Sequence, residues 1–83
     1  MEKSVFTKEY GIFLRVLRQA RKERGLTQAQ LAERLHETQS WISKVERAEH
    51  RLDLMELRAF CQALDIPLAE FVQQVEKALT ERE

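Results

Sequence analysis

Small polar and basic side chains are concentrated on one side of a single predicted helix, residues 38–47. At 100° per residue, Ser40, Ser43, Lys44 and Arg47 share its outer side, which holds no acidic residue. Short hydroxyl or amide groups can reach the edges of DNA bases, and a Lys or Arg can reach a guanine or a phosphate. This pattern is what a helix in the major groove requires. A polar helix face is also common on proteins that bind no nucleic acid.

Catalytic chemistry has no comparable support in the chain. No carboxylate pair, no nucleophile with a base and no set of metal ligands can be assembled, because His36 and His50 lack partners at usable spacing. The one cysteine, Cys61, stands between Phe60 and Leu64 in an apolar pattern typical of a buried thiol. We therefore expect no enzymatic activity, no metal and no cofactor.

The helix that carries these groups follows a second predicted helix after a short polar turn. Thr27 is the expected cap of this preceding helix, with Gln30 completing a capping box and Leu26 packing on Leu31 as a hydrophobic staple. The preceding helix ends near His36, and Thr38 caps the next one.

Three further helices are expected around this pair, because helix formers dominate and only two Gly and one Pro interrupt the chain. The first runs over residues 7–24 with Thr7 as its cap, and Gly25 follows as a left-handed residue. Another begins at Asp53, and the last begins with Pro67 as its first residue. The fold class is therefore all-α.

Apolar residues at spacings of three and four define the predicted core. They are Tyr10, Phe13, Leu14, Leu17 and Ala20, then Leu31, Ala32 and Leu35, then Ile42 and Val45, then Leu57, Phe60, Cys61 and Leu64, and last Leu68, Phe71 and Val72, after which the same stripe continues through Val75 and Leu79.

The 83 residues, 43% of them apolar, suit one small domain, which we place at residues 7–83 after an N-terminal arm of residues 1–6. No apolar run approaches the length of a membrane span or a signal peptide, so a cytoplasmic protein is expected. The net charge is zero, but residues 1–24 carry +4 and residues 52–83 carry −4. The acidic end can therefore turn away from a mildly positive remainder.

Two short patterns carry a family resemblance, namely L-T-Q-x-x-L-A from Leu26 and T-x-S-x-I-S-K-x-E-R from Thr38. With them, residues 13–71 resemble the Cro and lambda-repressor-like domain of the XRE family of transcriptional regulators. The resemblance implies a five-helix domain with a helix-turn-helix, in which residues 38–47 form the recognition helix and double-stranded DNA is the partner.

The resemblance also implies roles for individual residues. Base-edge positions are matched by Gln39, Ser40 and Lys44, and Ser43 falls close to the groove wall. Phosphate or DNA-backbone positions are matched by Gln28, Thr38, Arg47, His50 and Arg51, and the position of Gln28 is also one that can bond the first recognition residue. Arg21 and Glu46 match an internal ion pair, and the helical wheel independently turns Glu46 inward, where a buried acid needs such a partner.

The chain also departs from the family pattern at three positions. His36 and Ala48 stand where glycine is common. Trp41 occupies a flanking position with two open interpretations: it stacks on sugars and methyl groups of DNA, or it packs half-buried against the helix that begins at Thr27. Positive charge after residue 47 is sparse, which predicts modest affinity per monomer.

The sequence thus predicts a DNA-binding regulator, a repressor or autoregulator, that reads an inverted-repeat operator as a homodimer. The later part of the last stripe, Val75 to Leu79, has two open interpretations, a last turn of the core or a dimer contact, so about residues 72–83 are the candidate dimerisation segment. Two other functions stay open for the same fold. One is a protein-binding adaptor, which the balanced charge favours, and the other is the antitoxin of a toxin pair, which would bind a toxin as well as DNA.

Overall fold

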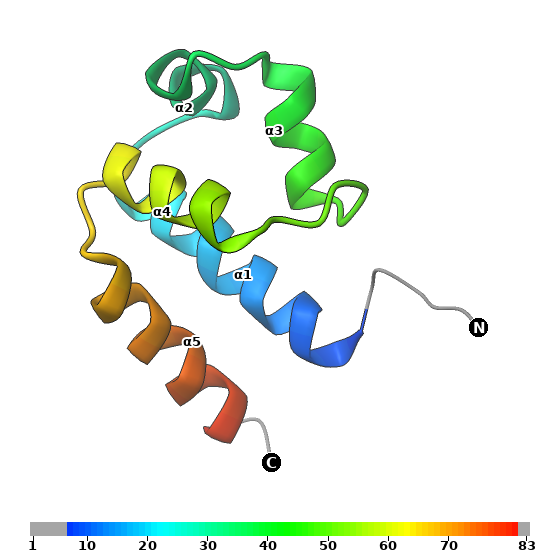
Figure 1. Cartoon of the computed structure of the whole chain (residues 1–83), viewed down its shortest axis with the longest axis vertical. Coiled ribbons are helices and arrows are strands. Elements are labelled where there is room, and N and C mark those ends of the chain that lie inside the picture. Colours follow the sequence, from blue (N-terminus) through cyan, green and yellow to red (C-terminus); the bar gives the residue numbers. More distant parts are fainter. Residues whose placement is uncertain (1–6, 82–83) are drawn as a thin grey trace.

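The computed structural model describes residues 7–81, which form five helices and no strand (Figure 1). The helices are α1 (Lys8–Glu23), α2 (Gln28–Leu35), α3 (Gln39–Glu46), α4 (Leu54–Ala63) and α5 (Leu68–Glu81). The predicted all-α, five-helix fold is confirmed. The predicted arm, residues 1–6, lies outside the described residues.

Side chains cap the starts of the helices as their residue types predict. The Thr7 hydroxyl accepts a hydrogen bond from the backbone N–H of Tyr10 at the start of α1. Thr27 and Gln30 form a complete capping box at α2, and Asp53 and Glu56 form another at α4. Each box satisfies two backbone N–H groups that a helix leaves without an internal partner. The last helix differs slightly from expectation, because α5 begins at Leu68, one residue after the proline.

Backbone with positive φ ends the first four helices. Gly25 has a φ of 71°, as expected, and His36, Ala48 and Asp65 have φ values of 57°, 66° and 59°. A left-handed conformation costs about 1 to 2 kcal/mol for a residue with a Cβ. His36 and Ala48 therefore keep the turn geometry that glycine would adopt more easily, at some expense in stability.

All five helices contribute to one hydrophobic core. Its largest fully buried side chains are Leu17, Leu31, Ile42, Val45, Phe60, Cys61, Leu64 and Phe71. One predicted core residue is wrong: Val72 is 48% exposed, because Phe71 beside it takes the inward position on α5. Of the rest of that stripe, Leu68 and Val75 pack against the core while staying partly exposed.

The helices are arranged so that the two ends of the molecule differ. In Figure 1, α2 and α3 lie together at one end of the longest axis, α5 lies at the other, and α1 and α4 lie between them. Acidic residues of α5, including Glu70 and Glu76, are therefore far from α3.

No helix within residues 7–81 is both long enough and apolar enough to cross a membrane.

Candidate nucleic-acid interface

The exposed face of α3 follows from how the helix is anchored. The Thr38 hydroxyl caps it by accepting a hydrogen bond from the backbone N–H of Trp41 at 3.1 Å. Ile42 and Val45 are completely buried, so they fix which side of α3 meets the core. The opposite side faces solvent.

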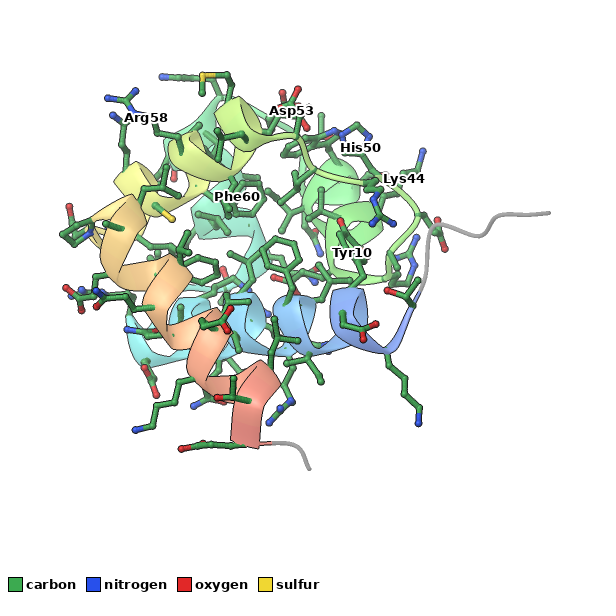
Figure 2. The ribbon with its side chains drawn as sticks, turned by 60° about the horizontal axis from the view of Figure 1, so that its bottom comes forward. Tyr10, Lys44, His50, Asp53, Arg58 and Phe60 are labelled. Atoms are coloured by element: carbon green, nitrogen blue, oxygen red, sulfur yellow. The ribbon has the colours of Figure 1, made fainter. Side chains whose placement is uncertain are left out.

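The predicted base-contacting residues all lie on that exposed side of α3. Gln39, Ser40 and Lys44 are exposed, and Ser43 is half-buried. In Figure 2 the Lys44 side chain projects away from the body of the protein. Exposed amide, hydroxyl and ammonium groups on such a helix can reach the edges of bases in the major groove of DNA.

A buried ion pair ties the end of α3 to α1. Arg21 donates from Nε to Oε2 of Glu46 at 2.7 Å and from Nη2 to Oε1 at 3.0 Å. Its Nη1 donates to the backbone carbonyl of Leu26 at 2.8 Å. The pair implied by the family resemblance is therefore present. Its two-bond geometry and the third hydrogen bond are what a buried guanidinium needs.

This pair extends through two amides to the first residue of α3. Gln28 donates from Nε2 to Glu46 Oε1 at 2.9 Å, and its own Oε1 accepts from Gln39 Nε2 at 3.3 Å. A continuous chain of hydrogen bonds thus runs from Arg21 in the interior to Gln39 on the surface. It restricts the orientation of the Gln39 amide before any ligand arrives.

A second arginine–glutamate pair lies on the surface at the C-terminal end of α3. Arg47 donates from Nε and Nη2 to the two carboxylate oxygens of Glu49, at 3.0 and 3.1 Å, and from Nη1 to the hydroxyl of Ser43. These bonds and the charge of Arg47 lower the pKa of Glu49, and the same contact raises the pKa of Arg47. An acid therefore lies beside a candidate phosphate contact.

Sequence reasoning did not single out Glu49. The outer face of α3 is free of acids within the helix itself, but the chain reverses after it and brings Glu49 back. The available signal was an acid two residues after an arginine, with Ala48 at the position where the resemblance places a glycine.

The segment after α3 is held to the protein rather than extended into solvent. His50 Nε2 lies 3.2 Å from Glu56 Oε2, and the Arg51 guanidinium stacks 4.5 Å from the centre of the Tyr10 ring. The Tyr10 hydroxyl accepts a hydrogen bond from the backbone N–H of Leu52 at 3.1 Å. Figure 2 shows Tyr10, His50 and Lys44 on this same side of the molecule. His50 and Arg51 thus have protein partners as well as their predicted DNA roles.

Trp41 is half-buried, as one of the two interpretations of this residue expected. Its ring lies 5.8 Å from that of Phe60 and 5.3 Å from that of His50, measured between centroids. These two aromatic contacts come from α4 and from the segment after α3. The other interpretation, stacking on DNA, concerns only the part of the ring that stays exposed.

Known proteins resemble this chain in sequence and in structure. The sequence matches a model of a helix-turn-helix domain over residues 9–73. An XRE-family like protein from Pseudomonas syringae pv. tomato str. DC3000 is similar in structure with a TM-score of 0.78 and 38% identity, over 83% of this chain and 84% of that one. A comparison with curated proteins gave no match.

Two more distant solved structures share the fold. The wild-type restriction-modification controller protein C.Esp1396I has a TM-score of 0.84 at 22% identity, over 93% of this chain and 100% of that one. The clp gene regulator ClgR from Corynebacterium glutamicum has a TM-score of 0.77 at 22% identity, over 89% of this chain and 79% of that one. At such identities the likeness is one of fold alone.

Proposed function

We propose that the chain, which belongs to the XRE-like helix-turn-helix family, is a DNA-binding transcription regulator that reads its operator with α3. The observation that carries the proposal is the exposed polar face of α3, whose first residue is oriented by the chain of hydrogen bonds from buried Arg21 to exposed Gln39. Side chains that are already oriented lose less conformational entropy on binding. α3 is thus suited to enter a major groove with little rearrangement.

Each proposed base contact follows from the chemical groups of its side chain. The amide of Gln39 can bond to two groups of an adenine, Lys44 to a guanine, and Ser40 to either kind of base. Ser43 would lie close to the groove wall. These contacts would determine which sequence is bound.

Register along the DNA would come from contacts to phosphates. We assign these to Gln28 and Thr38 at the starts of the two helices and to Arg47, His50 and Arg51 after α3. Arg51 can keep its contact with the face of the Tyr10 ring while an edge of the guanidinium meets a phosphate. His50 would have to share its Nε2 with Glu56 or leave it.

We further propose that the protein acts as a homodimer on an inverted repeat. Two copies of α3 would then lie about 34 Å apart, in successive major grooves. On α5, Val72 is 48% exposed and Leu79 is partly exposed on the same stripe, so this face is available for a second copy. Repression or autoregulation by such a dimer is the regulatory role that we propose.

A protein partner is the second candidate, as expected of an adaptor or antitoxin. Leu54 and Met55 at the start of α4 are 59% and 64% exposed and adjacent in the chain, so they offer a small apolar contact for a partner. If this candidate is right, a second protein copurifies with the chain and is lost when Met55 is replaced by Lys. Exposed Gln62 on the same helix, replaced by Lys, is the control for the added charge alone.

Selection of bound duplexes from a random pool tests the main proposal. We expect an inverted repeat whose half-sites are one helical turn apart, bound by two copies of the chain. Recovery of no enriched sequence, with no binding to random duplex even at low salt, would falsify the DNA-binding proposal. Enrichment of an undivided site bound by one copy would overturn only the homodimer.

A further inference from the structure

We propose that Glu49 attenuates binding to the DNA backbone by holding Arg47 in competition with a phosphate. The inference rests on the proposed function, because it assigns a new role to a residue beside the same interface. Glu49 is not one of the residues to which a base contact or a phosphate contact is assigned above. Its role would be to keep general affinity for DNA low, so that base contacts decide where the protein stays.

The backbone holds Glu49 in position for this competition. Its N–H donates to the carbonyl of Lys44 at 2.8 Å, which attaches it to the last turn of α3. Ala48, with its φ of 66°, turns the chain back between the two charged residues. The carboxylate is therefore placed beside Arg47 by local structure, and not by chance meeting of two long side chains.

The contact uses the same guanidinium groups that a phosphate would use. Both oxygens of Glu49 accept hydrogen bonds from Arg47, through Nε and Nη2, while Nη1 is bonded to Ser43. Arginine binds carboxylate and phosphate in the same two-bond manner. A phosphate that approaches this edge must displace the carboxylate or accept a poorer geometry.

Charge acts in the same direction. The hydrogen bonds and the charge of Arg47, and to a smaller extent the charge of Lys44, lower the pKa of Glu49, so the carboxylate is ionised at neutral pH. An ionised acid here offsets part of the positive charge of the interface and repels the phosphates. The side chains of Arg47 and Glu49 are 53% and 54% exposed, so this pair can open without unfolding any part of the protein.

The consequence is measurable as a salt dependence. Binding to B-DNA weakens with salt by a logarithmic slope of about 0.9 per phosphate that the protein neutralises. If Arg47 is occupied by Glu49, it contributes little to that slope in the wild-type protein. Removing the carboxylate should let Arg47 neutralise one more phosphate.

The test compares wild type with Glu49→Gln and Glu49→Ala on a random duplex over a series of salt concentrations. We expect both variants to bind more tightly at low salt, by roughly two- to fivefold, the range of one exposed ion pair. We expect the salt slope to steepen by about 0.9. Thermal unfolding should be unchanged, since the pair is on the surface.

Two controls separate this mechanism from others. Glu76→Gln on α5 changes the net charge by the same amount at the far end of the molecule and should leave the slope unchanged. In an Arg47→Ala background, removing Glu49 should lose most of its effect, because the two residues act as a unit.

Several results would overturn the proposal. Unchanged binding of the Glu49 variants means that the carboxylate has no effect on DNA binding. Weaker binding means that it helps Arg47 to contact DNA. An equal gain in Glu76→Gln means that only net charge matters. If wild type and variants all fail to bind any duplex, the proposed function falls as well. If wild type binds and the variants bind no better, the attenuation alone is wrong.

Discussion

Two arginine–glutamate pairs lie at the last turn of α3, and they share the same chemical groups but differ in burial and in their separation along the chain. Each joins one guanidinium to one carboxylate by two hydrogen bonds. Arg21 and Glu46 are 25 positions apart, and their side chains are 9% and 5% exposed. Arg47 and Glu49 are two positions apart, and theirs are 53% and 54% exposed.

The comparison teaches that burial decides what a given ion pair can do. A buried charge that loses its partner cannot be solvated, so breaking that pair is costly even where forming it gained little. An exposed pair is screened and can exchange partners with water or a ligand. The first pair is therefore suited to holding α3 in place, and the second to responding to DNA.

The largest effect is expected from Arg21→Ala. It leaves Glu46 buried with Gln28 as its remaining partner, and it removes the donor to the carbonyl of Leu26. We expect the free energy of unfolding to fall by about 3 to 5 kcal/mol. Chemical denaturation followed by circular dichroism measures it, with Arg15→Ala on the exposed side of α1 as the control.

Unchanged stability of Arg21→Ala would mean that the buried pair does not support the fold. If the variant does not fold at all, the double replacement Arg21→Met with Glu46→Leu keeps the question open to measurement. Replacing both partners by apolar residues should restore much of the stability, because no charge is then left buried. Failure of the double variant to recover would point to packing rather than charge.

Lys44→Ala should have the next largest effect, on binding instead of stability. We expect affinity for the selected duplex to fall by about 1 to 3 kcal/mol, with discrimination lost at one base pair. Lys77→Ala on α5 removes the same charge far from α3 and should change binding little. An equal loss on every duplex sequence would instead make Lys44 a phosphate contact.

Gln28→Ala should have a smaller effect, on both the stability of the fold and the affinity for DNA. It removes the link between Glu46 and Gln39 but leaves the ion pair intact. We expect roughly 1 kcal/mol of lost stability, the net value of one such hydrogen bond. We also expect weaker binding to the selected duplex, measured by titration. Ala29, exposed beside it, replaced by Ser is the control. Full affinity in Gln28→Ala would show that the amide chain does not orient Gln39.

Arg47→Ala should have the smallest effect on folding. Because this pair is on the surface, we expect its thermal unfolding to overlay that of the wild-type protein. The fluorescence of Trp41, the single tryptophan, reports on α3 in the same experiment. A large loss of stability here would break the contrast between the two pairs.

Local sequence signals predicted most of the fold. Capping residues such as Thr27, Thr38 and Asp53 begin helices where their types favour it, and the spacing of apolar residues identified the inward faces. These features depend on a few neighbouring residues, so they can be read along the chain. Val72 was misplaced because an apolar residue at the edge of a stripe fits either side.

The contacts of the candidate site could be predicted only in part. The family resemblance gave the Arg21–Glu46 pair and the link from Gln28 to α3, which no local rule reveals. The position of Glu49 depends on the backbone reversal at Ala48. The packing of Trp41 on Phe60 depends on how α3 and α4 cross. Such contacts arise from tertiary structure, where spacing in the sequence carries little information.

The central claim is that the outer face of α3 reads DNA sequence. Its most direct test is the affinity of the protein for a duplex recovered by selection, compared with a scrambled duplex of the same composition at one fixed salt concentration. We predict tighter binding to the selected duplex by a factor of about 10³ or more, the range of specific over non-specific complexes. Equal affinity for the two duplexes would contradict it.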